Sequence, residues 1–147
     1  MFKKILVPVD GSALSHAAGE LAADLARQHG AQIVGVYVID PFPYIGIGEA
    51  SAVGLQAYLA EAKAAADRAL SDLKAVCEAR GVPFVGDTIE RNVTYEGILE
   101  TAQAEGCDLI VMGSHGRKGV QALILGSVAQ KVLTHAKVPV LVVKPRD

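Results

Sequence analysis

The sequence predicts an α/β protein built on an open, five-stranded parallel sheet with helices on both faces. Short apolar runs alternate with longer segments of helical periodicity along the whole chain, an order that is typical of such sheets. The chain has 147 residues, 51% of them hydrophobic, which is enough for a single core. No break in composition divides it, so we expect one domain over residues 1–147.

The first two strands are expected at residues 4–9 and 32–39. The run 4–9 (KILVPV) is almost wholly apolar without alternation, which indicates a central strand buried on both faces. Pro8 has no N–H to donate, so it is expected at the carboxyl end of that strand. Ser12 is placed to cap a helix that runs to His29. Residues 41–54 show no period and predict a long loop.

The second half of the chain adds three strands and three helices, with the strand 83–89 nearer an edge of the sheet. Thr94 is placed to cap the second of these helices. The remaining elements are expected as strands over residues 83–89, 108–112 and 138–143, and as helices from Leu55 to Gly81, from Thr94 to Gly106 and from Ser127 to about His135.

A glycine-rich stretch follows the fourth predicted strand. Gly113 and Gly116 come directly after it, and Gly126-Ser127 opens the last predicted helix. Small residues at the end of a strand, followed by a helix start, let backbone N–H groups approach a phosphate. Ligands of such sheets bind at the carboxyl ends of the strands where the chain order reverses, which here fits the ends at residues 9–11 and 112–114. Glycines that only make turns are the alternative.

Charge and composition exclude several classes of partner. The net charge is −2 and no long basic run occurs, which argues against nucleic acid or an anionic membrane surface. No apolar stretch is long enough to insert into a membrane. Cys77 and Cys107 fall in apolar patterns and are expected to be buried free thiols. No targeting segment precedes the first strand, so a cytoplasmic protein is expected. The histidines lack a metal-ligand spacing, so no protein-bound metal site is expected.

Four stretches resemble the universal stress protein family, in matching order along the whole chain. They are Lys4–Ser12 (KILVPVDGS), Met112–Gly116 (MGSHG), Gly126-Ser127 and Lys137–Val143 (KVPVLVV). Nucleotide-binding members of that family carry Gly-x2-Gly-x9-Gly-(Ser/Thr) after the fourth strand, and the glycines here have that spacing. The resemblance implies a Rossmann-like fold of the adenine nucleotide alpha-hydrolase type.

The resemblance also implies an ATP site, with Mg²⁺ as the expected companion of a triphosphate. It places Pro8, Val9, Asp10 and Val38 around the adenosine, Met112, Gly113, His115 and Gly116 beside the ribose and phosphates, and Gly126, Ser127 and Val128 at the helix start that holds the phosphates. Asp10 could instead cap the first helix. The chain departs from the family at Ala129, where many ATP-binding relatives have a hydroxyl, and at residues 91–93, which replace a turn of small residues and proline.

The site holds no evident catalytic group. Ser114 and His115 suggest a nucleophile and a base, but adjacent side chains rarely meet in the required geometry and no third group is apparent. Arg117 and Lys118 could offset phosphate charge. We therefore expect a regulatory, stress-response module that holds ATP and acts through a protein partner of unknown identity. The alternatives are a slow ATPase or phosphotransferase on the same site, and a nucleotide-free adaptor of the same fold.

The last predicted strand also indicates a homodimer. Val138–Val143 is apolar throughout, yet the chain order places it at an edge of the sheet. An exposed apolar edge promotes aggregation unless it is covered, and a second copy across a two-fold axis would cover it. Family members are commonly homodimers through this strand. Shielding by the long helix or by a terminal segment is the alternative.

Overall fold

The computed structural model describes residues 1–41, 51–116 and 125–146. Five strands within these residues form one parallel sheet in the order β3-β2-β1-β4-β5. The predicted fold class is therefore confirmed. The elements are β1 (Lys4–Pro8), α1 (Ala13–His29), β2 (Gln32–Ile39), α2 (Ser51–Ala79), β3 (Phe84–Glu90), α3 (Thr94–Glu105), β4 (Leu109–Gly113), α4 (Ser127–His135) and β5 (Val140–Val143).

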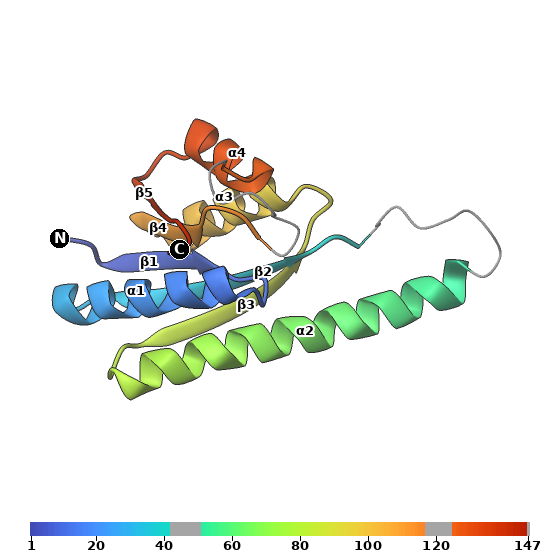
Figure 1. Cartoon of the computed structure of the whole chain (residues 1–147), viewed down its shortest axis with the longest axis horizontal. Helices are drawn as coiled ribbons and strands as arrows, with labels where there is room; N and C mark the ends of the chain where they lie inside the picture. Colours follow the sequence, from blue (N-terminus) through green and yellow to red (C-terminus); the bar gives the residue numbers. More distant parts are fainter. Residues whose placement is uncertain (42–50, 117–124, 147) are drawn as a thin grey trace.

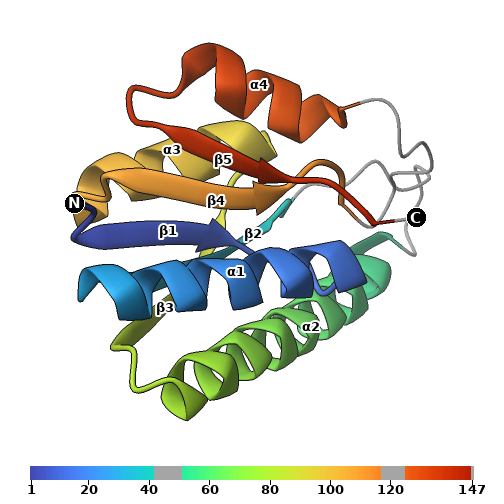
Figure 2. The same ribbon diagram turned by 60° about the vertical axis from the view of Figure 1, so that its left-hand side comes forward.

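The helices cover both faces of the sheet, α1 and α2 on one and α3 and α4 on the other (Figures 1 and 2). Each pair of helices closes its own apolar cluster. β1 lies at the centre: Ile5 and Val7 point into the cluster beneath α1 and α2, and Leu6 points into the other, all three fully buried. A strand buried on both faces must be apolar at consecutive positions, which is the pattern that predicted it.

The chain reverses its direction across the sheet at β1. β2 pairs with one edge of β1 and β4 with the other, with Leu6 opposite Ile110. The segments that follow β1 and β4 therefore leave the sheet side by side at its carboxyl edge, because neighbouring parallel strands end on the same side. This juxtaposition confirms the predicted switch point and positions the candidate site.

α2 is longer than the sheet that it covers. At 1.5 Å per residue its 29 residues span about 44 Å, whereas the seven residues of β3 span about 23 Å. Figure 1 shows the amino-terminal part of α2 extending past the ends of the strands. The predicted loop 41–54 is wrong at its end, because residues 51–54 are helical. A single Gly54 costs a helix only about 1 kcal/mol. Residues 42–50 lie outside the described part.

β1, β3 and β4 differ from the prediction by one residue at one or both ends, and the start of α3 and of β5 differ as well. Ser12 caps α1 as expected, its Oγ accepting the Ser15 N–H at 3.1 Å. Thr94, however, is the first residue of α3; Val93 occupies the cap position and no side chain caps that end. β5 begins at Val140 rather than at 138, because Pro139 has no N–H for the ladder and contributes only its carbonyl, which accepts the Ile110 N–H at 3.0 Å.

Both cysteines are buried free thiols, as predicted. Burial raises the pKa of Cys77 and of Cys107 to about 11, so both stay protonated and unreactive at neutral pH. Among the described helices, none combines the length and the apolar character needed to cross a membrane.

Candidate functional site

The turn after β1 is closed by hydrogen bonds among Asp10, Ser12 and Ser15. Val9 is still held to β2, its N–H donating to the Val36 carbonyl at 2.9 Å. Asp10 Oδ1 accepts the Ser12 N–H at 2.9 Å, and the Asp10 N–H donates to Ser15 Oγ at 3.2 Å. Gly11 adopts the left-handed conformation, with φ at 85°, that this tight turn requires. Asp10 thus supports the turn but does not cap α1, whose N-cap is Ser12, and its role in ligand binding stays a prediction.

Backbone hydrogen bonds of Ser114 hold the segment after β4 to β5 and to the residue that precedes α4. The Ser114 N–H donates to the Val143 carbonyl of β5 at 2.8 Å, and the Ser114 carbonyl accepts the Gly126 N–H at 2.7 Å. Its side chain is 1% exposed, and Oγ lies 3.2 Å from His115 Nδ1. The expectation that these adjacent side chains do not meet is therefore wrong. Within the described residues no carboxylate bonds to His115, so the pair is not extended to a triad.

Gly116 and Gly126 allow close packing rather than a special turn. Neither has a positive φ, so a left-handed backbone conformation is not the reason for glycine at either position. A Cβ on Gly116 would overlap Asp10 Oδ2. A Cβ on Gly126 would lie 3.0 to 3.1 Å from His115 Cβ, His115 Cα and the Ser114 carbonyl oxygen. The absence of side chains at these two positions therefore brings Asp10, His115 and the start of α4 together.

The first turn of α4 presents backbone donors. Its N-cap is Gly126, which makes no side-chain cap, and Ser127 and Val128 are its first two residues. The first N–H groups of a helix have no partner within the helix, and its dipole adds about half a positive charge at that end. Ala129 is 1% exposed and packs with the core beside Val132.

Val38 and Met112 lie on the face of the sheet covered by α3 and α4. Met112 is buried in that cluster, and Val38 packs against it at the end of β2. A Cβ on Gly97 would lie 3.1 Å from Val38 Cγ1, so α3 sits unusually close to this strand end. Gly113, at the end of β4, faces the other side against Leu14. The predicted residues thus meet at one edge of the sheet but belong to both of its faces.

A groove of about 410 Å³ opens beside His115 and Gly116. Its volume falls within the range of small-molecule sites. The sequence prediction missed most of its lining, because these residues belong to the apolar side of α1 and to the segment after β5: Ser12, Ala13, Leu14, Ala17 and Pro145. The small residues Ala13 and Ala17, one helical turn apart, are the signal that could have pointed to a groove.

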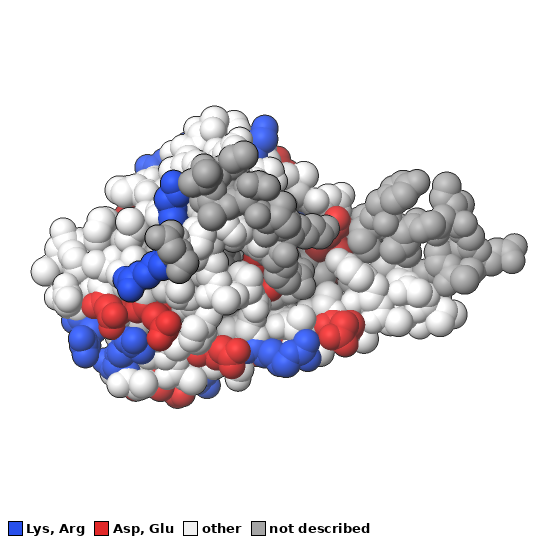
Figure 3. Space-filling model, viewed as in Figure 1, with Lys and Arg blue, Asp and Glu red and all other residues white. Residues whose placement is uncertain are grey.

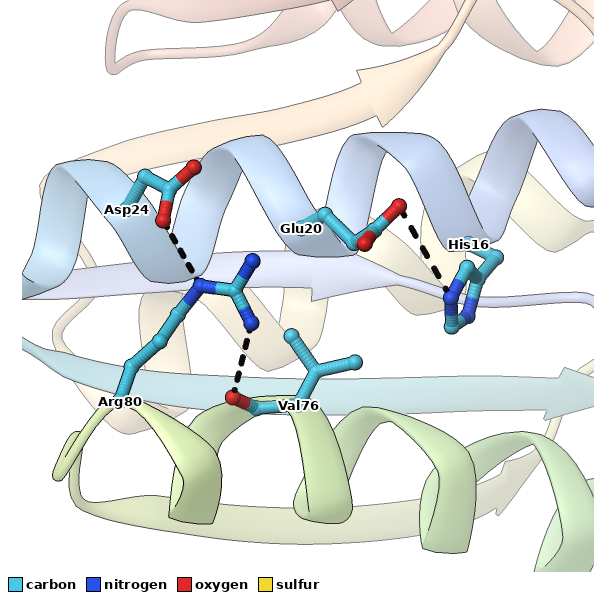
Figure 4. A network of polar contacts seen from close by, with 5 residues as sticks. All are labelled: His16, Glu20, Asp24, Val76 and Arg80. Carbon is cyan, nitrogen blue, oxygen red and sulfur yellow. Dashed lines mark hydrogen bonds and ion pairs between the residues drawn. The ribbon is translucent and has the colours of Figure 1, made fainter.

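Asp24 of α1 pairs with a charged residue of α2 and does not line the groove. Figure 4 shows Arg80 reaching from α2 to Asp24, with 2.7 Å between Nε and Oδ1, and to the Val76 carbonyl at 3.2 Å. The hydrogen bond from Arg80 lowers the pKa of Asp24. His16 and Glu20 are 3.9 Å apart on the same side of α1. The nearby cavity, about 40 Å³ in volume, is too small for a nucleotide.

Positive and negative side chains are interspersed on the face shown in Figure 3, where blue and red groups alternate along α1 and α2. That face carries no extended patch of one sign. Arg117 and Lys118, expected to offset phosphate charge, lie outside the described residues. The start of α4 supplies partial positive charge to an anion at this edge of the sheet.

Comparisons with known proteins give one family. The sequence model of the universal stress protein family matches residues 1–144. A universal stress protein of Methanocaldococcus jannaschii is 36% identical over 144 residues, which cover 98% of this chain and 83% of that protein. Another, from Thermus aquaticus, is 36% identical over 146 residues, which cover 98% of this chain and 100% of that protein.

Solved structures share the fold. A universal stress protein of Methanocaldococcus jannaschii gives a TM-score of 0.83 at 28% identity, covering 100% of this chain and 99% of that one. Two more distant structures are similar in fold alone. A universal stress protein from Archaeoglobus fulgidus in complex with dAMP has 23% identity, a TM-score of 0.70 and coverage of 97% and 98%. One in complex with cAMP has 22% identity, a TM-score of 0.67 and coverage of 97% and 96%.

Proposed function

The chain belongs to the universal stress protein family, and from that premise we propose that it is a cytoplasmic regulatory module that binds an adenine nucleotide, ATP in the first place. The observation that carries this proposal is the meeting of three features at the switch point of the sheet. These are the start of α4 without a side-chain cap, the His115 side chain packed against Gly126, and the Asp10 carboxylate beneath Gly116.

In this proposal the start of α4 binds the phosphates. The backbone N–H groups of Ser127 and Val128 and the Ser127 hydroxyl would donate to phosphate oxygens, and the helix dipole would add about 0.3–1 kcal/mol. Among the described residues at the switch point, Asp10 supplies a carboxylate, whose Oδ1 already accepts the Ser12 N–H. It fits the pattern by which proteins hold Mg²⁺, through one or two carboxylates together with the phosphates of the ligand.

The adenosine would lie against the carboxyl ends of β1, β2 and β4. Pro8 and Val38, which are partly exposed, would offer apolar surface there, the buried Val9 and Met112 would support that surface from the core, and Gly113 would lie on the side towards β4. The related structures with dAMP and cAMP support adenine nucleotides as a class. The preference for a triphosphate rests on the glycine spacing and on the start of α4.

Calorimetric titration with ATP, with and without Mg²⁺, tests the proposal. We expect saturable binding by the wild type and its loss in Gly126→Ala, because the added methyl group presses on backbone atoms of residues 114 and 115. Gly54→Ala is the matched control, since a Cβ there meets nothing within 4 Å. Absence of saturable binding by the wild type, or unchanged binding by Gly126→Ala, would contradict the proposal.

A slow ATPase or phosphotransferase is the second candidate, because Ser114 Oγ lies 3.2 Å from His115 Nδ1. We consider holding ATP the better supported function, since Ser114 is 1% exposed and cannot reach a ligand as a nucleophile. Release of phosphate from ATP by purified protein decides between the two. We expect the rate to equal the buffer background; turnover that is lost in His115→Ala would establish the enzyme.

A nucleotide-free adaptor is the third candidate, in which the surface of the protein rather than the crevice does the work. Mass spectrometry of protein purified without added nucleotide separates it from the first two. Retained adenine nucleotide would exclude it. The protein partner that a regulatory module needs stays unidentified.

We also propose that two copies pair through β5. This strand is the edge of the sheet next to β4, and Leu141 is 37% exposed at its centre. Within the described chain, no element pairs with its outer edge. A second copy related by a two-fold axis would continue the sheet and cover Leu141.

A further inference from the structure

We propose that Ser114 is a positioning residue that fixes the tautomer of His115. In this tautomer Nε2 carries the ring proton, and the Nε2–H group donates a hydrogen bond to an oxygen of the bound nucleotide. The geometry behind this inference is the buried contact between Ser114 Oγ and His115 Nδ1. The second half of the inference, donation to a nucleotide, rests on the proposed function. The first half, the tautomer, does not.

Ser114 presents its hydroxyl to His115 from a backbone that is fixed in place. Its backbone is held at both polar atoms, by the Val143 carbonyl at 2.8 Å and by the Gly126 N–H at 2.7 Å. Its side chain is 1% exposed, so water does not reach it. In the described part of the chain, His115 Nδ1 is the partner that the structure gives to Oγ.

The direction of this hydrogen bond follows from the needs of the hydroxyl. If Nδ1 carried the proton, Oγ would accept it, and the buried hydroxyl hydrogen would be left without an acceptor. An unsatisfied buried donor is costly, whereas an unused lone pair on an oxygen that already makes one bond is tolerated far more often. The hydroxyl therefore donates to Nδ1, and the proton of the neutral ring is assigned to Nε2.

Nε2 is then the polar atom of His115 that remains for a ligand. His115 lines the groove of about 410 Å³ together with Gly116, and the α1 residues that complete this part of the lining include Ala13, Leu14 and Ala17. Beside these apolar side chains, the Nε2–H group of His115 would pair with an acceptor oxygen of the ligand. On an adenine nucleotide that oxygen belongs to a ribose hydroxyl or to a phosphate.

The tautomer is measured without nucleotide. Protein labelled with ¹⁵N in its imidazole rings is examined by long-range ¹H–¹⁵N NMR at pH 8, and His115→Ala assigns the signals among the four histidines. We expect His115 to show protonated Nε2 and unprotonated Nδ1, and Ser114→Ala to shift these signals towards a mixture of tautomers. Ser114→Thr, which keeps the hydroxyl, should restore them, and the exposed Ser71→Ala is the control. A protonated Nδ1 in the wild type would overturn the inference.

The donor role is measured by binding of ATP and of adenosine to the same variants. We expect about tenfold weaker ATP binding for His115→Ala, in line with the loss of one hydrogen bond. Ser114→Ala should weaken ATP binding by less than tenfold. The double variant should bind ATP as tightly as His115→Ala does. Weakening for ATP alone assigns the acceptor to a phosphate, and weakening for both ligands assigns it to the ribose.

The two proposals fail in different ways. ATP binding that is unaffected by Ser114→Ala, or effects of the two single variants that add in the double variant, would overturn the positioning role while leaving the nucleotide site in place. No ATP binding by the wild type would remove the nucleotide site and the donor role, while the NMR result on the tautomer would stand by itself. Thermal unfolding of each variant verifies that it is folded.

Discussion

A methyl group added at Gly126 has a different neighbour from one added at Gly116. At Gly126 it meets the Ser114 carbonyl oxygen and His115 Cα at 3.1 Å, which are backbone atoms that cannot move separately from the loop. At Gly116 it meets the end of the Asp10 side chain, which can shift, at the expense of its hydrogen bond from the Ser12 N–H, without moving the backbone. The same substitution should therefore have unequal costs at the two positions.

We predict that Gly126→Ala lowers the free energy of unfolding by about 1–3 kcal/mol, the usual cost of overpacking, and that Gly116→Ala lowers it by less. Urea denaturation of both variants measures the difference. Gly54→Ala, in the exposed part of α2, should instead raise stability by up to about 1 kcal/mol, because alanine is the better helix former. Equal losses at residues 116 and 126 would contradict this account of the packing.

At the scale of elements, Asp108 joins the starts of β1 and β4. Its carboxylate accepts the Lys3 N–H at 2.9 Å and the Lys4 N–H at 3.1 Å. Burial acts to raise the pKa of Asp108, but these backbone hydrogen bonds outweigh it and the pKa is lowered overall. A carboxyl group whose pKa is lower in the folded state stabilises the fold above its unfolded pKa, and this stabilisation is lost as the pH falls through the folded pKa.

We predict that Asp108→Asn lowers the free energy of unfolding by about 1–3 kcal/mol at pH 7, the range for hydrogen bonds to a charged group. The difference from the wild type should shrink as the pH falls below about 4, because the wild-type carboxyl then becomes protonated as well. Urea denaturation at pH 7 and at pH 3 measures both values. Asp67→Asn, on the exposed side of α2, is the control and should show little difference at either pH.

The sequence predicts the elements well where burial alone decides them. β1, β2 and β4 are continuous apolar runs because both of their faces are covered, and such runs are visible in one dimension. The boundaries that differ depend on single residues with weak preferences. Gly54 and its neighbours did not prevent helix, and Thr94 lies one position inside α3 rather than at its cap.

The site could be predicted in its location but not in its internal contacts. The strand ends and the glycine spacing identify the place, because the topology follows from the order of elements. The approach of Asp10 to Gly116 and the clamping of Ser114 between Val143 and Gly126 join segments far apart in the chain. No local pattern encodes such contacts. The Ser114–His115 bond was missed for this reason, since its geometry depends on that clamp.

At the scale of the whole molecule, pairing through β5 should depend on its exposed apolar side chain. We predict that Leu141→Lys yields a monomer, because a lysine at the centre of an edge strand opposes pairing with another edge. Light scattering coupled to size-exclusion chromatography measures the mass. Val53→Lys, at a 73% exposed position on α2, is the matched control and should remain a dimer. A monomeric wild type, or a dimeric Leu141→Lys, would contradict pairing through β5.

The hydrogen bond from the Ser114 N–H to the Val143 carbonyl has one further consequence. It joins the segment that carries His115 to the strand at which two copies would pair, so the proposed nucleotide site and the proposed pairing surface would share a structural element. If ATP binding and dimerisation are coupled, thermodynamic reciprocity requires that each changes the affinity of the other by the same factor. Sedimentation equilibrium with and without ATP measures this factor. A value different from one would make the cellular concentration of the protein itself a determinant of how much nucleotide it holds.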